Sequence, residues 1–310
     1  MGKTTEIKKY KSPCGREINF PVAKIKGIND GPKVLIIAGV HGCEYPSIVA
    51  AIRFSQELKP EEISGEVTII PVCSTLAFEK RTVFVNPIDG KNPNRVVPGN
   101  LTGTYSDALT YYLYQDFIAK ADYFLDLHGG DMVEALEPFS IYHEGENKET
   151  ARLSREIAEY FLLPNVLHTV PGASWDDSGT TYGNAARAGI PSAILEAGGI
   201  GQLDQPSVDK HLIGLRNVLR HFKVLKGEAV KPQNVQHYND FVWLRSPAAG
   251  IFYRAVEVGD TLKKGQKIGH VEDYFGNILA EMNSTHDGKV MFLTSSPAMA
   301  DQGLILGMGV

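Results

Sequence analysis

The stretch KVLIIAGVHGCE, residues 33–44, joins an apolar run to residues that bind metal ions. The run is mostly aliphatic and rich in branched side chains, which is typical of a strand buried on both faces. It stops at His41, and Glu44 follows three positions later. A helical pattern comes next, from about Tyr45 to Leu58. The stretch therefore predicts a strand, a turn and a helix of an α/β fold.

Two other apolar runs end in the same way. The run Asp122–Leu127 stops at His128, and the run Ile190–Leu195 stops at Glu196. In open α/β sheets, ligands bind outside the carboxyl ends of the strands. If the three strands are neighbours, two histidines and two glutamates meet in one crevice, and we expect the functional site there.

The rest of the first 230 residues alternates between strand and helix patterns, after a polar, β-rich lead-in over residues 1–31. Further strands are expected at 67–72, 138–142 and 166–170, and further helices at 107–121, 148–162, 179–188 and 206–223. Between them, residues 73–106 read as one long irregular loop, and loops of that length are usually functional. This alternation predicts a catalytic domain over 1–230 of the α/β class, with a mixed, mainly parallel sheet covered by helices on both faces.

The pattern changes after a polar linker. From Trp243 on, short β-type runs alternate with glycines, and three glycine pairs recur at an offset of 38 residues, beginning with Gly250 and Gly288. We predict an all-β C-terminal domain over 241–310. It resembles the barrel-sandwich fold of lipoyl and biotinyl carrier domains, which hold a modified lysine in their central hairpin. Residues 268–288 contain no lysine, so the resemblance does not extend to a carrier role.

Composition narrows the class of protein. The chain has 310 residues, of which 43% are hydrophobic and 22% charged, as in ordinary globular proteins. A net charge of −5 gives no reason to expect a nucleic acid or an anionic membrane as partner. No apolar run is long enough for a membrane span, the N-terminus lacks a signal-peptide core, and three scattered cysteines suit a reducing compartment. We expect a cytoplasmic protein.

His41, Glu44 and His128 are the candidate metal ligands. In the first turn of a helix, side chains three positions apart share one face and can reach a common ion. With His128 they make the two-histidine, one-glutamate set of a catalytic zinc site that keeps an open position. The alternative is that His41 caps the helix and Glu44 favours its positive end. Asp126 lies on the same side of its strand as His128, where it would orient that histidine or act as a structural acid.

Glu196 is the candidate general base, because a carboxylate beside a metal-bound water can take and return a proton. The alternative is a buried carboxylate paired with an arginine. In the long loop, Arg81, Asn94 and Arg95 offer donors, and guanidinium groups bind carboxylates through paired hydrogen bonds. Cys43 is a weaker candidate as a nucleophile, since a helix start favours a thiolate.

Taken together, His41 and Glu44, the segment Asn94–Gly99, the segment Asp126–Gly129 and the run that ends at Glu196 resemble the succinylglutamate desuccinylase/aspartoacylase family, a branch of the zinc carboxypeptidase-like fold. The resemblance covers most of the chain and implies Zn²⁺ on His41, Glu44 and His128. It also implies that Glu196 activates water, that Arg81 stabilises the carbonyl oxygen, and that Arg95 and Asn94 hold the substrate carboxylate. The chain departs from the family pattern at Cys43 and at Asn92-Pro93, where the family usually has Asp and Asp-Leu.

The expected function is therefore that of a zinc-dependent amidohydrolase that removes a small acyl group from an N-acyl amino acid. Two alternatives stay open: a metallocarboxypeptidase that cleaves short peptides, and a zinc-dependent binding module without catalysis. Glu44 and His128 are 84 residues apart, which is shorter than in the digestive carboxypeptidases and favours the deacylase. Residues 172–180 are expected to contact the substrate. The C-terminal domain is expected to roof the site, or else to form a homo-oligomer interface.

Overall fold

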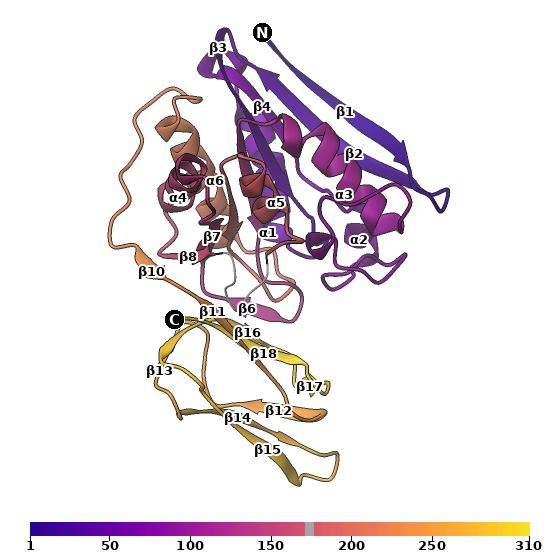
Figure 1. Cartoon of the computed structure of the whole chain (residues 1–310), viewed down its shortest axis with the longest axis vertical. Helices are drawn as coiled ribbons and strands as arrows, with labels where there is room; N and C mark the ends of the chain where they lie inside the picture. The colour runs from indigo at the N-terminus through magenta and orange to yellow at the C-terminus, as the bar shows by residue number, and fades with distance from the viewer. Residues whose placement is uncertain (171–176) are drawn as a thin grey trace.

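The structure is a computed structural model that describes residues 1–170 and 177–310 (Figure 1). Its helices are α1 (Tyr45–Glu57), η1 (Pro60–Glu62), α2 (Thr75–Lys80), η2 (Pro93–Arg95), α3 (Tyr105–Asp116), η3 (Ile118–Lys120), α4 (Lys148–Tyr160), α5 (Thr181–Arg187) and α6 (Gln205–His221). The strands of the large sheet are β1 (Gly2–Lys11), β2 (Glu17–Lys26), β3 (Asn29–Ala38), β4 (Ser64–Ile70), β5 (Tyr123–His128), β7 (Phe139–His143), β8 (Asn165–Thr169), β9 (Ser192–Glu196) and β10 (Gln236–Tyr238).

These nine strands form one mixed sheet in the order β1-β2-β4-β3-β5-β9-β7-β8-β10. Its centre is parallel: β3 pairs in parallel with β4 and β5, and β5 pairs in parallel with β9. The strands β1, β2 and β7 bring in antiparallel pairs. The predicted mixed, mainly parallel sheet is confirmed, and so is the predicted neighbourhood of the three strands that precede His41, His128 and Glu196.

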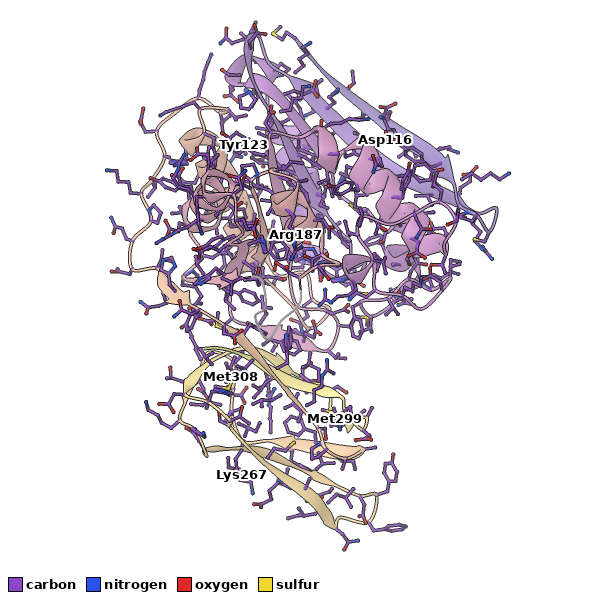
Figure 2. The ribbon with its side chains drawn as sticks, in the orientation of Figure 1. Asp116, Tyr123, Arg187, Lys267, Met299 and Met308 are labelled. Carbon is purple, nitrogen blue, oxygen red and sulfur yellow. The ribbon has the colours of Figure 1, made fainter. Side chains whose placement is uncertain are left out.

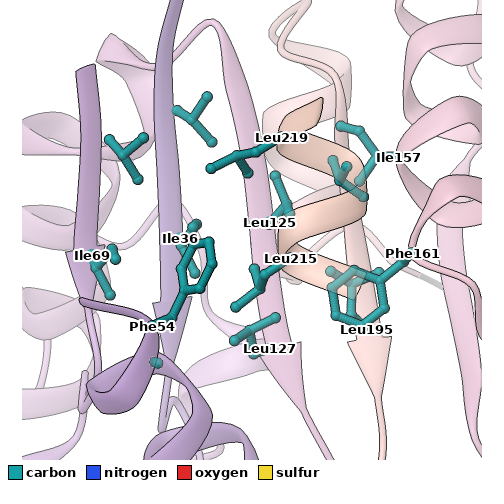
Figure 3. Packing of buried hydrophobic residues seen from close by; sticks show 14 of the residues in the cluster. Ile36, Phe54, Ile69, Leu125, Leu127, Ile157, Phe161, Leu195, Leu215 and Leu219 are labelled. Atoms are coloured by element: carbon teal, nitrogen blue, oxygen red, sulfur yellow. The ribbon is translucent and has the colours of Figure 1, made fainter. Parts of the chain in front are cut away.

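Helices cover both faces of the sheet because alternate residues of each central strand point to opposite faces. On one face, Ile36, Leu125 and Leu195 pack against residues of α1, α4 and α6, including Phe54 and Leu215 (Figure 3). On the other face, side chains of the same strands pack against residues of α3 and α5. The long apolar runs seen in the sequence are thus buried from both sides.

Two features of the chain before β5 differ from prediction. Residues 73–106 are not one irregular loop, since they contain α2 and the short helix η2. The first central strand ends at Ala38, and α1 begins at Tyr45. His41 and Glu44 therefore lie in the turn between strand and helix rather than in the first helical turn, because Pro46 occupies one of the first two helical positions and starts the helix after Glu44.

The C-terminal region consists of two small antiparallel sheets. One contains β11 (Phe241–Arg245), β18 (Leu304–Gly309), β16 (Gly288–Thr294) and β13 (Thr261–Leu262), and the other contains β15 (Ile278–Asn283), β14 (Lys267–Glu272), β12 (Gly250–Arg254) and β17 (Ala298–Met299). The two sheets enclose an apolar cluster that includes Met299 and Met308 (Figure 2). The paired glycines Gly250 and Gly288 each begin a strand, as expected of a structural repeat.

One strand crosses the predicted domain boundary. The strand β6 (Glu134–Leu136) belongs to the catalytic region by sequence, but it pairs antiparallel with β16 of the C-terminal region. The ion pair between Lys289 Nζ and Glu137 Oε1, at 2.6 Å, lies beside this seam. The division into 1–230 and 241–310, like the resemblance to carrier domains, stays a prediction.

Residues 171–176 are outside the described part of the chain, and with them most of the segment 172–180 that is expected to contact the substrate. Within the described residues, no helix has the length and apolar character needed to cross a membrane.

Candidate active site

The turn after β3 and the ends of β5 and β9 meet at one edge of the sheet. His128 and Glu196 are direct register partners at the last positions of adjacent strands. Ala38, three residues before His41, pairs with Leu127 on the next strand. Because the carboxyl ends of parallel strands share an edge, residues far apart in the chain come together there.

His41, Glu44 and His128 form a compact cluster. Each offers one possible ligand atom, and these atoms lie within 4.8 Å of one another. His41 Nδ1 is 2.6 Å from Glu44 Oε1, and His128 Nδ1 is 3.1 Å from Glu44 Oε2. Both imidazoles therefore present the same nitrogen to the glutamate. This is the only such group of three or more possible ligands found among the described residues.

The other nitrogen of each imidazole faces an oxygen that orients the ring. His41 Nε2 lies 3.0 Å from Asn92 Oδ1, which also accepts the Asn94 N–H. His128 Nε2 lies 3.0 Å from Asp126 Oδ1, although the two atoms are not aligned for a hydrogen bond. Asp126 also accepts a hydrogen bond from the Thr181 hydroxyl. Partners of this kind fix the tautomer of a metal-binding histidine.

The cluster fits a divalent cation better than it fits itself. Glu44 is buried, and its Oε2 accepts no hydrogen bond. A buried carboxylate oxygen without a partner is costly, and a metal ion in contact with it removes that cost. Burial by itself would raise the pKa of Glu44, but His128 and His41 outweigh it and hold the pKa at about 2. The carboxylate is thus ionised, as a ligand must be.

Glu196 stands beside this cluster at the end of β9. Its Oε2 is buried and has no hydrogen-bond partner. Burial raises the pKa of Glu196 well above its usual value, and the carboxylates of Glu44 and Glu134 add to the effect, while His128 opposes it. Glu196 forms no ion pair with an arginine of the described residues, which argues against the structural alternative.

A cavity of about 600 Å³ opens over the cluster. His41, Glu44, His128 and Glu196 line its floor. Residues of the C-terminal region, among them Arg245, Met299 and Leu304, complete its wall. The site therefore lies between the large sheet and the C-terminal sheets.

The loop residues are placed differently from one another. Asn94 and Arg95 line the cavity. The Asn94 side chain is buried, and its Oδ1 accepts the Thr181 N–H at 2.9 Å. Arg95 donates from Nη1 to the Asn94 carbonyl at 2.7 Å. Arg81 ends α2 in a left-handed conformation, is exposed, and is not among the residues that line the cavity.

Residues 30–222 match the model of the succinylglutamate desuccinylase/aspartoacylase catalytic domain. The chain belongs to this family. It is 29% identical, over 92% of its length and 84% of the relative's, to N-alpha-acetyl-L-2,4-diaminobutyric acid deacetylase of Halomonas elongata.

Solved structures of the family share the fold. The product-bound ectoine utilisation protein EutE (DoeB) of Ruegeria pomeroyi is 25% identical, with a TM-score of 0.90 over 100% of this chain and 95% of that one. The succinylglutamate desuccinylase/aspartoacylase of Rhodobacter sphaeroides is 24% identical, with a TM-score of 0.87 over 99% and 94%. These alignments include the C-terminal sheets, so the family fold extends over the whole chain.

The departures of this family member from the usual pattern have distinct structural roles. Asn92 takes the position that orients His41, and it does so with an amide oxygen. Cys43 is buried and donates to the Thr82 carbonyl at 3.1 Å. Burial, with the nearby Asp131, raises the pKa of Cys43 to about 11. The expected thiolate is therefore wrong, because desolvation outweighs the influence of the nearby helix start.

Sequence reasoning gave Glu134 no role of its own, although its side chain lines the cavity. Burial, with the neighbouring charges of Asp131 and Glu44, raises the pKa of Glu134 to about 7. The pattern around Glu134 carries little signal, because β6 has only three residues and its partner strand lies far along the chain. The two glycines after His128 are the one local hint of a close backbone approach.

Proposed function

We propose that this chain is a zinc-dependent amidohydrolase that removes a small acyl group from an N-acyl amino acid. Membership of a deacylase family supports the reaction class, and the substrate named for the Halomonas elongata relative is an N-acetyl amino acid. The observation that carries the proposal is the group of His41, Glu44 and His128 with Glu196 beside it, at the floor of a cavity.

His41, Glu44 and His128 would hold the ion through two imidazole nitrogens and a carboxylate. Bound zinc lowers the pKa of a bound water to about 7 and polarises a carbonyl group. Glu196 would accept the proton of the attacking water through its carboxylate and then deliver it to the departing amine. Asn92 and Asp126 would keep the two imidazoles turned so that Nδ1 faces Glu44.

Arg95 and Asn94 would bind the α-carboxylate of the substrate, since both line the cavity beside the cluster. A guanidinium group suits this task because its planar fork matches a carboxylate. We keep Arg81 as the proposed donor to the carbonyl oxygen in the transition state. Its exposed position at the end of α2 means that the loop after α2 must bring it to the substrate.

The test combines metal analysis with a substrate panel. The purified protein should carry one zinc ion per chain, and His128→Ala should lose most of it while keeping its circular dichroism spectrum. The zinc-loaded enzyme should hydrolyse members of a panel of N-acetyl, N-succinyl and N-formyl amino acids. Full zinc occupancy in a His41→Ala, His128→Ala double variant would refute the metal site. Zinc binding without hydrolysis of any panel member would refute the enzyme and leave a binding module.

A further inference from the structure

Glu134 brings a negative charge to the cavity for which the described residues supply no counter-ion. Its carboxylate lines the same cavity as the metal cluster, but it is not one of the three grouped ligands. Its only hydrogen bond is accepted by Oε2 from the Asp131 N–H, at 3.0 Å. None of the ion pairs between described residues includes Glu134, and Asp131 next to it is a second acid.

The cations of the cavity wall are committed elsewhere. Arg245 Nη1 donates to the Gln302 carbonyl at 2.9 Å within the C-terminal region. Arg95 donates to the Asn94 carbonyl and is proposed above to bind the substrate carboxylate. Buried carboxylates in proteins are normally paired with a cation or bound to a metal. A carboxylate that faces a substrate cavity without such a partner is placed to receive the cation from the substrate.

The backbone of Glu134 is held rigidly from three sides. Its carbonyl accepts the Ile200 N–H at 2.9 Å, and Glu134 pairs with Thr294 of the C-terminal region. A Cβ atom at Gly130 or at Gly199 would lie 2.3 Å from the same carbonyl oxygen. These glycines follow His128 and Glu196 closely in the chain, so the loops after both strands clamp Glu134. Binding groups on such supported backbone keep their position precisely enough to discriminate between substrates.

We propose that Glu134 binds a cationic group on the side chain of the substrate, so that the amino acid released by the enzyme carries a second amino group. The inference rests on the proposed function and names the substrate class of that same site. An ammonium group in this position forms a charge-assisted hydrogen bond to the Glu134 carboxylate. A second carboxylate on the substrate side chain would instead be repelled by Glu134 and Asp131.

The test compares two substrates of equal shape. In Nα-acetylnorvaline a methyl group replaces the side-chain ammonium of Nα-acetyl-2,4-diaminobutyrate. For the zinc-loaded wild-type enzyme, kcat/KM should favour the diamino substrate about 10- to 100-fold, as expected for a hydrogen bond to a charged group. Glu134→Gln should reduce this ratio to near 1. Glutamine still accepts the Asp131 N–H, so a purely structural role of Glu134 would leave the ratio unchanged. The control Glu79→Gln, on exposed α2, should keep the wild-type ratio.

A wild-type ratio near 1, or a preference for Nα-acetylglutamate, would overturn the inference while leaving the deacylase proposal in place. An unchanged ratio in Glu134→Gln would also overturn it, even if both substrates reacted more slowly. If the zinc-loaded protein hydrolyses no N-acyl amino acid, the proposed function falls instead. Calorimetry then decides on Glu134: free 2,4-diaminobutyrate should bind the wild type at least 10 times more tightly than Glu134→Gln, by the same estimate, and equal binding refutes the role.

Discussion

At the scale of single residues, Glu196 is the side chain on which the proposed chemistry depends most. It shares a register position with His128 and has a buried oxygen without a hydrogen-bond partner. Its surroundings raise the pKa, and only the ionised form can accept a proton. His128 is the neighbour that favours the ionised form, which ties the metal ligand to the base. Such crowding of acids is typical of catalytic sites.

Glu196→Gln should therefore lower kcat about 100-fold or more, because the amide keeps the shape of the side chain but cannot take the proton. Zinc content should stay at the wild-type level, since Glu196 is not one of the three grouped ligands. Steady-state kinetics and metal analysis on the same preparation measure both quantities. A near-normal kcat with bound zinc would assign the proton transfer to another carboxylate, with Asp126 or Glu134 the next to test.

At the scale of elements, Asp177 joins two strands and a helix on the flank of the site. Its Oδ2 lies 2.8 Å from His143 Nδ1 on β7 and accepts the Thr169 hydroxyl of β8 at 2.5 Å. Arg187 at the end of α5 forms an ion pair with Oδ1 (Figure 2). Burial raises the pKa of Asp177, but these hydrogen bonds and charges outweigh it and lower the pKa to about 2.

A folded-state pKa below the unfolded value of about 4 means that ionised Asp177 stabilises the fold. The contribution is complete above pH 4 and disappears as the pH falls from about 4 to 2. Asp177→Asn should lower the free energy of unfolding at pH 7 by about 2 kcal/mol. Urea unfolding should show a smaller difference between variant and wild type at pH 3. The exposed Asp209→Asn is the control, and an equal difference at both pH values would contradict the linkage.

At the scale of the whole molecule, the C-terminal sheets bound the cavity and are anchored to the catalytic region. The strand pairing of β6 with β16 is extended by backbone hydrogen bonds from Ser295 N to the Val133 carbonyl, at 2.8 Å, and from Glu137 N to the Met291 carbonyl, at 2.9 Å. Residues on both sides of this seam line the cavity. A wall held by a continuous sheet does not swing away without breaking several hydrogen bonds.

This wall should limit the length of the acyl part of the substrate. Activity should fall steeply from an N-acetyl amino acid to an N-acetylated dipeptide and further to a tetrapeptide, because the wall leaves no path for a polypeptide. Kinetics on this series of blocked substrates measure the effect. Undiminished release of the C-terminal residue of the tetrapeptide would contradict both the wall and the deacylase proposal, and would favour a carboxypeptidase.

The sequence by itself was enough to place the three central strands and the side chains at their ends. Long apolar runs are buried wherever they fold, and a run covered on both faces belongs to the centre of an α/β sheet. His41, Glu44, His128 and Glu196 could therefore be predicted to share an edge before any geometry was known. Local signals also placed α1, because Pro46 marks the helix start.

Only the tertiary structure decided what surrounds these residues. Asn92 reaches His41 across 51 positions of sequence, and β6 finds its partner more than 150 residues along the chain, so no local pattern announces either contact. The same holds for the burial that keeps Cys43 protonated and for the exposed position of Arg81. Periodicity reports which side chains are buried, whereas charge balance within a cavity depends on which distant segments meet there. For that reason the metal ligands were predicted, and Glu134 was found only in the folded chain.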